Sequence, residues 1–351
     1  MVQPFSFPPV KKKYFHRFCR IAATAAHFPP TIVSNQQIID QGGLSVTDSA
    51  MRKGLGVERR RIAEKGIADS DLLAEAARKC LDRAGLLPEN LSKLLVTKFI
   101  GDRILPMTAA LVQRKLKSPL AFHALDIDGG ITAFLNALDY AVRCFSSTAS
   151  SDQHILIVSG GTHTAAISKT DPRLAFLFGD GAAALLLSSS ADQHFLASYF
   201  YTNYHYYQSA GSRQLKMDKW LSDDIYEKGN YALLYDFYRM DNWKETIDFT
   251  LEAARVTRDN LLLESGLSMK DIDWVLVTEN NKKIHELTCE TLSVPPEKTI
   301  TVLNEYGNTM SAMLPILLDK LYTEERLQSG MTVMLISHGE GASGGGMIYR
   351  V

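Results

Sequence analysis

Short apolar runs alternate with amphipathic segments along most of this chain. Runs of strand length occur at 18–25, 91–99, 124–127, 154–159, 274–278, 300–303, 332–337 and 346–351. Segments with apolar residues at helical spacing occur at 69–84, 104–116, 131–138, 243–265, 282–292 and 311–321. Strands that alternate with helices in this way predict a layered α/β fold.

The order of these elements in the second half of the chain repeats the order in the first. This repetition predicts a duplicated α/β half-domain, although the two halves share no visible sequence identity. We expect an N-terminal arm at 1–18, an N-terminal half at 19–192 and a C-terminal half at 193–351. An aromatic-rich insert at 199–243 is expected to be either a lid over a pocket or a small aromatic core.

The segment 122–138 reads as a strand, a tight glycine turn at Gly129-Gly130 and the start of a helix. A helix N-terminus gathers unpaired amides and the positive end of the helix dipole, which favour an anion or a thiolate. The segment therefore resembles the frame of an active site. The residue at that helix start is Ile131, which has no reactive atom.

Composition excludes several classes of function. The chain has 351 residues, 38 basic and 39 acidic side chains and a net charge of -1, so no global field points to nucleic acid. Its four cysteines show neither disulfide-framework nor metal-ligand spacing, and we expect no metal and no cofactor. No apolar run has membrane-spanning length, and the lysines at 11–13 read as a solvated arm rather than a secretory signal. We expect a cytoplasmic protein.

Some local patterns admit two interpretations. Arg59, Arg60 and Arg61 beside two glycines suit either a phosphate site or a solvated turn. His163 and His338 both adjoin glycine turns, where each suits a pocket base or, more commonly, a hydrogen-bonded structural histidine.

Five segments together resemble the ketoacyl-acyl-carrier-protein synthase III (KAS III) branch of the thiolase superfamily. The segment Leu55-Gly-Val-Glu-Arg-Arg-Arg-Ile62 is similar to the family's early "TGIRERHI" element, and 125–134 to the block around its nucleophile. Phe178-Gly-Asp-Gly-Ala-Ala-Ala184 is close to "FGDGAGA", Tyr306-Gly-Asn-Thr-Met-Ser-Ala312 resembles "GNTSAAS", and Gly339-Glu-Gly341 resembles the C-terminal glycine loop. In order and spacing these matches cover the chain from about residue 20 onward, and they imply a thiolase-like fold with mixed central sheets.

The resemblance implies Claisen chemistry, in which a helix-capping cysteine accepts an acyl group while a histidine and an asparagine assist decarboxylation. Here the asparagine is retained as Asn308, but the cysteine position is Ile131 and the histidine position is Thr278. Isoleucine cannot attack a thioester, so an acyl-cysteine mechanism at this position is excluded. Thr132 is the next residue, so its side chain points about a hundred degrees around the helix axis from that of Ile131. It is therefore improbable that Thr132 replaces the cysteine as nucleophile.

The resemblance also implies contacts to coenzyme A and to a carrier protein. The family's tryptophan and arginine for the adenine end fall on Ala50 and Gly54, which can neither stack on a base nor pair a phosphate. Lys282 and Lys283 lie where the family presents basic groups to a phosphopantetheine carrier, although a solvated helix face is the simpler explanation for them. Leu105 occupies the tip of the loop that, in this family, reaches the neighbouring subunit's pocket.

Two functions follow from these features. In the first, the chain is a catalytically degenerate subunit that forms a homodimer or heterodimer and supports a cysteine-bearing ketosynthase partner. In the second, it is an acyltransferase or condensing enzyme that positions an acyl-CoA or acyl carrier protein for direct transfer without a covalent intermediate. A weaker third interpretation is a non-catalytic binder of acyl chains. The residues expected to line the substrate site are Thr132, Leu105, Glu279, Asn281, His338, Gly339 and Gly341.

Overall fold

Two mixed β-sheets form the frame of the protein. The computed structural model describes residues 5–10, 18–103, 105–146, 153–167, 171–206 and 243–351. The first sheet has the order β1 (Cys19–His27), β7 (Gly181–Ser189), β6 (His154–Gly161), β4 (Lys93–Thr97) and β5 (His123–Ile127). The second has the order β8 (Phe195–Thr202), β11 (Ser343–Arg350), β10 (Thr332–Gly339) and β9 (Trp274–Val277). Each sheet contains parallel and antiparallel pairs, which confirms the predicted α/β fold with mixed sheets.

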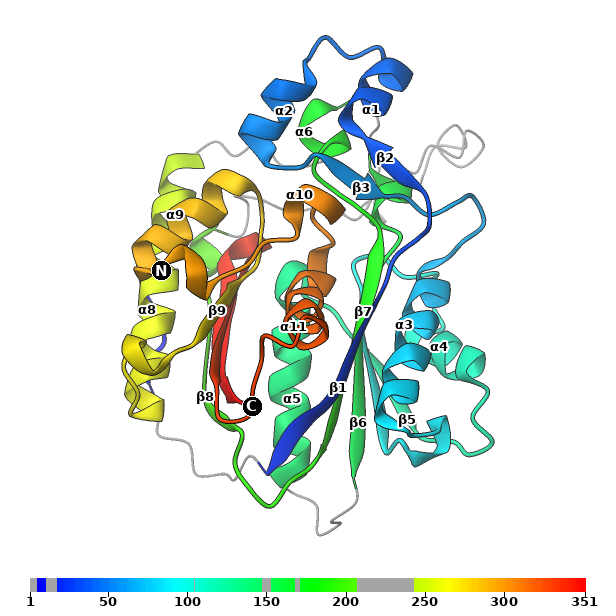
Figure 1. Cartoon of the computed structure of the whole chain (residues 1–351), viewed down its shortest axis with the longest axis vertical. Coiled ribbons are helices and arrows are strands. Elements are labelled where there is room, and N and C mark those ends of the chain that lie inside the picture. Colours follow the sequence, from blue (N-terminus) through cyan, green and yellow to red (C-terminus); the bar gives the residue numbers. More distant parts are fainter. Residues whose placement is uncertain (1–4, 11–17, 104, 147–152, 168–170, 207–242) are drawn as a thin grey trace.

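Helices lie between the sheets and over their outer faces (Figure 1). α5 (Ala133–Ser146) and α11 (Met313–Thr323) occupy the layer between the two sheets. α3 (Asp69–Ala84) and α4 (Thr108–Leu116) cover the first sheet, while α8 (Trp243–Ser265) and α9 (Lys282–Leu292) cover the second. The predicted division into halves falls between β7 and β8, and we retain it as a proposal.

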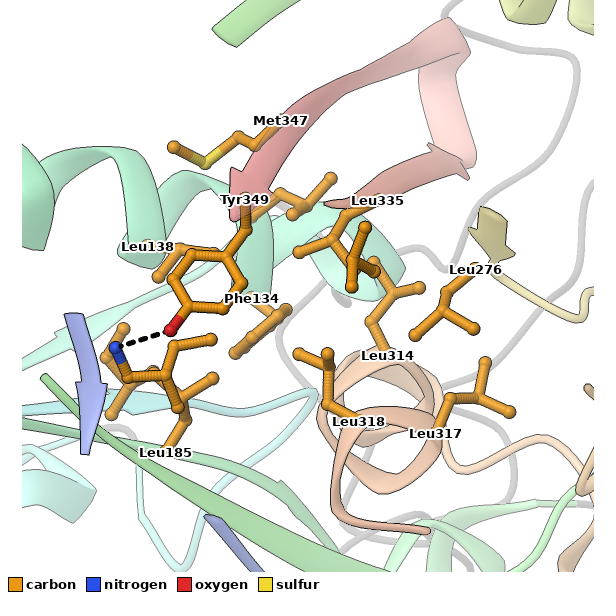
Figure 2. Close-up of a cluster of buried hydrophobic side chains, with 14 of the residues drawn as sticks. Phe134, Leu138, Leu185, Leu276, Leu314, Leu317, Leu318, Leu335, Met347 and Tyr349 are labelled. Carbon is orange, nitrogen blue, oxygen red and sulfur yellow. Dashed lines mark hydrogen bonds between the residues drawn. The ribbon is translucent and has the colours of Figure 1, made fainter. Parts of the chain in front are cut away.

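The central core joins the first and last strands of the chain. Figure 2 shows Phe134 of α5, Leu314 of α11 and Tyr349 of β11 packed together in this core. The Tyr349 hydroxyl accepts a hydrogen bond of 3.2 Å from the backbone N–H of Ile21. Because the β1–β7 register shifts between Ile21 and Ala23, a side chain from the other sheet satisfies a donor at an irregular point of the ladder.

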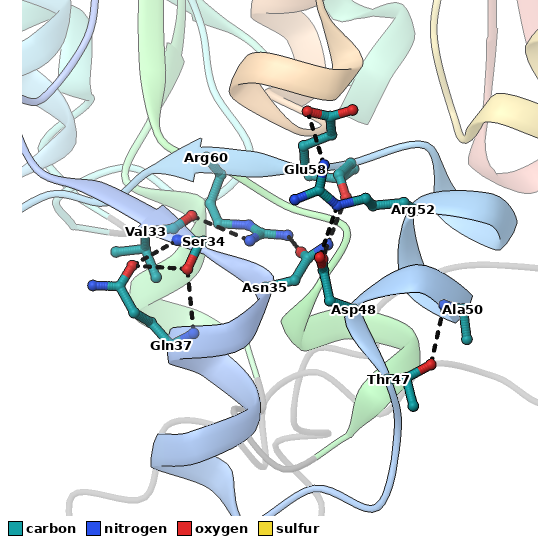
Figure 3. A network of polar contacts seen from close by, with 11 residues as sticks. Val33, Ser34, Asn35, Gln37, Thr47, Asp48, Ala50, Arg52, Glu58 and Arg60 are labelled. Carbon is teal, nitrogen blue, oxygen red and sulfur yellow. Dashed lines mark hydrogen bonds and ion pairs between the residues drawn. The ribbon is translucent and has the colours of Figure 1, made fainter.

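A small cap carries β2 (Ile32–Ser34), α1 (Asn35–Gly42), α2 (Asp48–Leu55) and β3 (Arg59–Arg61). Ser34 forms a capping box with Gln37 at the start of α1, as its sequence predicts. Arg60 is fully buried, and its guanidinium donates to Asn35 Oδ1 at 2.6 Å and Val33 O at 3.2 Å (Figure 3). It also donates to Phe176 O at 2.7 Å. The bonds to Asn35 and Val33 join elements within the cap, and the bond to Phe176 O joins the cap to the body of the protein.

The phosphate interpretation of the three arginines is therefore wrong. Arg60 is committed to buried acceptors, Arg61 donates to Pro29 O and Pro30 O, and Arg59 pairs with Glu305 at 3.3 Å. The prediction of a solvated turn is also wrong for Arg60, because its side chain is buried and bonds to acceptors that are distant in the sequence.

Helices with strong patterns of their own match their predictions closely. α3, α8 and α9 begin and end at the predicted residues. By contrast, the predicted helix at 104–116 begins later, at Thr108, so Pro106 is not in its first turn. The cause is Asp126 of β5, whose carboxylate accepts hydrogen bonds from Thr108 N at 2.9 Å and Ala109 N at 2.7 Å.

Two further expectations are corrected. Residues 300–303 form no strand; α10 (Leu303–Tyr306) starts there instead, because the Glu279 carboxylate binds the backbone N–H of Val302 at 3.0 Å. The arm is not simply solvated, since Phe7 stacks on Phe249 with ring centroids 5.2 Å apart. The lysines at 11–13 lie outside the described residues.

The aromatic segment begins as part of the second sheet rather than as a lid. Tyr199 and Tyr201 belong to β8 and are buried, and Tyr201 packs with Tyr206 and Phe249. The aromatic-core alternative therefore holds for residues up to 206. Residues 207–242 of the expected insert lie outside the described residues.

Candidate functional site

Ile131 lies at the end of β5, where the chain turns into α5. Gly129 and Gly130 have φ values of 147° and 57°, which bring the chain from the strand into the short 3₁₀ turn at Gly130–Thr132. Ile131 is only 5% exposed. The strand, glycine turn and helix predicted around a nucleophile are thus present, but the residue at that position is buried.

Ile131 belongs to a buried group of apolar side chains, which we refer to as the Ile131 cluster. Its buried members come from four separate parts of the chain: Ile131, Ile167, Leu174, Phe178, Met310 and Met313. Met310 and Met313 are each 1% exposed. Methionine fills irregular space well, so Met310 and Met313 suit a closely packed apolar surrounding for Ile131.

Thr278 and Asn308, the other two positions implied by the resemblance, are both buried and hydrogen bonded. The Thr278 hydroxyl accepts from the backbone N–H of His338 at 3.1 Å. The Asn308 side chain accepts from Met310 N at 2.8 Å through Oδ1 and donates to Asn280 O at 3.5 Å through Nδ2. Met310 has φ of 55°, so Asn308 supports a strained turn. The asparagine therefore has a structural reason to persist.

Thr132 and Gly339 lie against each other. A Cβ added to Gly339 would come within 2.9 Å of Thr132 Cγ2, so glycine at position 339 permits this contact. The Thr132 hydroxyl donates to Gly129 O at 2.8 Å, which closes the turn rather than presenting an oxygen to a substrate. Gly341, with φ of 66°, supplies a left-handed turn at the end of β10.

His338 belongs to β10 and not to a glycine turn. It is 4% exposed, its Nδ1 lies 3.0 Å from the hydroxyl of Tyr201, and its Nε2 has no partner among the described residues. Burial lowers the pKa of His338 to about 4, so the imidazole is neutral. Among the predicted site residues that the structure describes, His338 is the one with a buried side-chain polar atom that lacks a hydrogen-bond partner.

His163 is also buried, with Nε2 3.2 Å from Thr309 O. Burial lowers its pKa, although the nearby carboxylates of Asp69 and Asp180 oppose that effect. Asp180 accepts hydrogen bonds from Ala63 N, Thr164 N and the Thr164 hydroxyl at 2.7 to 2.8 Å. His163 and Asp180 are thus held in structural roles.

Glu279 does not face the Ile131 cluster. Its carboxylate binds Val302 N and the hydroxyl of Thr301, in the loop before α10. Burial raises the pKa of Glu279 to about 7, while those hydrogen bonds oppose the shift. Its predicted place in the lining of a substrate site stays a prediction, and its carboxylate is engaged by the loop before α10.

Asn281 is the N-cap of α9, and its side chain accepts from Ile284 N at 3.0 Å. Lys282 and Lys283 follow it and are exposed. Leu105 is 81% exposed, and Ala50 and Gly54 both lie on the exposed surface of α2. Docking of a carrier protein to the two lysines and insertion of Leu105 into a neighbouring subunit remain predictions.

Cavities lie on either side of this centre. One of about 640 Å³ lies between α1, the loop 62–67 and residues 162–180, and shares Ile167, Leu174 and Phe178 with the Ile131 cluster. Another of about 770 Å³ lies between α2 and α9 and is lined by charged groups, including Arg52, Lys282 and Glu279. Neither is lined by Ile131, Thr278 or Asn308.

Sequence reasoning missed the partners of these positions. Tyr201 comes from a distant segment, and although Asp126 and Met310 lie in the matched motifs, no pattern predicted the side chains or backbone groups that they contact. In the part of the chain that the structure describes, no group of three or more His, Cys, Asp or Glu side chains is placed to hold a metal ion. Within the same residues, no helix has both the length and the apolar character needed to cross a membrane.

Two family models match the chain. The model described as 3-oxoacyl-[acyl-carrier-protein (ACP)] synthase III matches residues 125–203, and that of the C-terminal part of the same synthase matches residues 262–351. The first contains the turn at Ile131, and the second contains Thr278 and Asn308.

Relatives and solved structures agree with these matches. The β-ketoacyl-[acyl-carrier-protein] synthase III of Koribacter versatilis is 26% identical over 334 residues, covering 95% of this chain and 98% of that protein. The corresponding synthase of Xanthomonas campestris is 27% identical over 339 residues, with coverage of 95% and 98%. The crystal structure of the Aquifex aeolicus synthase III aligns with a TM-score of 0.83 at 24% identity, over 95% of this chain and 100% of that one. The priming β-ketosynthase of the R1128 polyketide pathway gives 0.83 at 22%, with coverage of 98% and 99%.

Proposed function

Because the chain belongs to the KAS III branch of the thiolase superfamily, we propose that it is a catalytically degenerate subunit that supports a cysteine-bearing ketosynthase partner. The pathway class is fatty-acid, polyketide or related acyl-thioester biosynthesis. The observation that carries the proposal is the Ile131 cluster: the nucleophile position is 5% exposed and packed against Met310 and Met313. Covalent acyl transfer requires an activated nucleophile with space for the thioester, and this centre has neither.

The histidine position supports the same proposal. The Thr278 hydroxyl accepts a hydrogen bond from the backbone N–H of His338 in β10. A neutral hydroxyl in that bond cannot take up and return a proton as an imidazole does. Two of the three reactive positions therefore serve packing or backbone hydrogen bonding.

Surfaces suited to a partner lie near this centre. β5 is an edge strand of its sheet, so one row of its backbone groups is unpaired within the described chain. Leu105 is 81% exposed on the neighbouring loop, where it offers an apolar side chain to a partner. We propose that both face a second KAS III-like subunit, in a homodimer or a heterodimer.

The proposal is tested by acyl labelling and reconstitution. The purified chain is incubated with acetyl-CoA and octanoyl-CoA, and its intact mass is measured; we expect no adduct. Co-expression with a cysteine-bearing KAS III homologue of the same organism should give a complex whose condensing activity exceeds that of the homologue alone. A stable acyl adduct on this chain would overturn the proposal.

A matched pair of variants isolates the contact. Leu105→Asp should abolish the gain in activity, because a charge would enter the interface. Leu263→Asp is the control, since Leu263 is 71% exposed on α8. Equal activity of the Leu105→Asp and Leu263→Asp complexes would show that Leu105 does not lie in the interface.

A second candidate is a condensing enzyme or acyltransferase without a covalent intermediate. It is favoured by His338, whose Nε2 is buried without a partner among the described residues and whose Nδ1 is held by Tyr201. Such an imidazole, together with Asn308, would hold or deprotonate a bound thioester. This candidate predicts turnover by the chain alone that is lost in His338→Gln and Asn308→Ala, whereas no turnover by the unmodified chain eliminates it.

A further inference from the structure

Residues 5–10 of the N-terminal arm lie on a set of aromatic side chains from β8 and α8. Phe7 stacks on Phe249 of α8 with ring centroids 5.2 Å apart, and it meets Tyr201 of β8 edge-on at 5.8 Å. Phe5 lies 6.1 Å from the same Phe249 ring. Aromatic rings at these separations attract one another beyond the area that they bury. We refer to Tyr199, Tyr201 and Phe249 as the arm site.

Two hydrogen bonds hold the backbone of the arm at this site. The Tyr199 hydroxyl donates to Pro8 O at 2.7 Å, and Asn203 Nδ2 donates to Ser6 O at 3.4 Å. Rings at positions 5 and 7 thus alternate with bonded carbonyls at positions 6 and 8, as in an extended segment. The site therefore contacts both the side chains and the backbone of the arm.

The arm is held by fewer contacts than the helices and strands around it. It forms neither helix nor strand, and within residues 5–10 only Phe7 is partly buried. Chain ends held in this way separate from the body more readily than the core elements do. Pro8 and Pro9 also keep the free arm extended, so it loses little conformational freedom on docking. Proline-rich segments of this kind are recognised by aromatic side chains in several peptide-binding domains.

Tyr201 connects the arm site to His338. Gly344 of β11 lies between these two residues in the second sheet, paired with Tyr201 on one side and with His338 on the other. A Cβ at position 344 would come within 2.3 Å of the Tyr201 hydroxyl oxygen. Glycine there lets that hydroxyl pass over β11 and reach His338 Nδ1 at 3.0 Å. The ring that Phe7 contacts is therefore the ring that orients the imidazole.

The direction of this bond fixes the tautomer of His338. Burial raises the pKa of Tyr201 far above its usual range, so the phenol keeps its proton. If Tyr201 donates to Nδ1, the proton of the neutral imidazole is on Nε2, and that N–H is the only unpaired group. The reverse direction would leave both the phenol proton and the Nε2 lone pair without a partner among the described residues. The geometry favours the Nε2–H tautomer.

We propose that the arm site binds residues 5–10 as a detachable peptide ligand, and that its occupancy holds Tyr201 against His338. The ligand class is an extended segment with two aromatic rings two residues apart, followed by proline. When the arm leaves, Tyr201 loses its contact with Phe7, and water competes for the hydroxyl that orients the imidazole. No residue of the Ile131 cluster takes part, so this inference is independent of the proposed function.

Peptide binding to the full chain tests the proposal. The probe is an acetylated and amidated peptide with the sequence of residues 5–10, and the host is the double variant Phe5→Ala and Phe7→Ala. The peptide should bind this variant at least about tenfold more tightly than the unmodified chain, whose own arm competes from within the molecule. A peptide with both alanine substitutions should not bind. Absence of binding to the double variant, or equal binding to both chains, would overturn the proposal.

A matched pair of tyrosine variants locates the peptide. In the double variant, Tyr199→Phe removes the hydroxyl that donates to Pro8 O and should weaken the peptide about fivefold. Tyr206→Phe is the control, since its hydroxyl donates to Glu245 and not to the arm. Equal affinity of the two variants would place the peptide elsewhere and overturn the proposal.

Nitrogen NMR of histidine-labelled protein tests the effect on His338, whose signals are assigned with His338→Gln. In the unmodified chain Nε2 should be protonated and Nδ1 should be an acceptor. Both signals should move toward the average of the two tautomers in the double variant, and saturating peptide should restore them. With Tyr201→Phe added, the peptide should still bind but leave His338 unchanged. Thermal melts check each fold, and Tyr199→Phe alone, which keeps every ring, gives the same test if the double variant melts early. His338 signals that ignore the arm would overturn the proposal.

Discussion

Glu279 gives a direct test of how burial governs the chemistry around this centre. The substitution Glu279→Gln keeps the shape of the side chain and its hydrogen bonds: the amide oxygen can accept from Val302 N, and the amide nitrogen can donate to Thr301. It removes only the ability to ionise. Any change in stability with pH that differs between the two proteins therefore reports on this carboxyl group.

The expected magnitude follows from the pKa. Burial raises the pKa of Glu279 from its ordinary value of 4.5 to about 7 in the folded protein. Below pH 4.5 the group is protonated in both states and has no effect. As the pH rises toward 7 the unfolded state ionises first, so the native protein loses stability, up to about 3 kcal/mol at about 1.4 kcal/mol per pH unit. The glutamine variant should escape this loss.

Urea denaturation at intervals from about pH 5 to pH 8 measures the difference. The difference between the free energies of unfolding of the two proteins should be smallest at about pH 5 and should grow steadily, until the variant is favoured by about 3 kcal/mol more at pH 8 than in acid. Parallel curves would show that Glu279 is ionised at its ordinary pKa in the native state. That result would refute the assignment of Glu279 to a dry, structural position.

Three other substitutions test other parts of the structure. Arg60→Met should lower the free energy of unfolding by about 2 to 4 kcal/mol, because three buried acceptors lose a charged donor, whereas exposed Arg59→Met should cost less than about 1 kcal/mol in the same urea assay. His338→Phe should reduce the loss in free energy of unfolding at acid pH. Burial lowers the His338 pKa from 6.5 to about 4 in the folded protein. Between these two pH values the unfolded state therefore binds a proton that the folded state does not, which destabilises the folded state. Thermal melts at about pH 5 and pH 8 measure this, and an equal acid shift in both proteins would contradict it. Ile131→Cys should acquire no acyl group from acetyl-CoA by intact mass, since packing rather than the missing sulfur alone closes the site.

The fold was predictable where local pattern and final environment agree. α3, α8 and α9 carry their own apolar faces, so their bounds follow from the sequence. The start of α4 does not, because a carboxylate on β5 caps it from outside the helix. The prediction of a strand at 300–303 is wrong for the same reason. Its apolar residues suit a strand, but the Glu279 side chain accepts a hydrogen bond from a backbone N–H there, and α10 begins.

At the candidate site, too, the local structure could be predicted from the sequence but the neighbouring side chains could not. The strand, glycine turn and helix around Ile131 are encoded within one short segment and were predicted from it. What surrounds Ile131 was not, since Met310, Leu174 and Phe178 are brought there only by the folded chain. His338 was mistaken for a turn residue because the glycine that follows it suggested a loop, whereas β10 extends through Gly339.

The bond between Tyr349 and Ile21 bears on how the protein is made. The two residues are 328 positions apart, so β1 leaves the ribosome long before the side chain that satisfies its irregular donor exists. Until β11 is synthesised, β1 has an unsatisfied amide and the core between the sheets lacks Met347 and Tyr349. The first sheet and the core between the sheets are therefore completed only when the last strand, β11, is present.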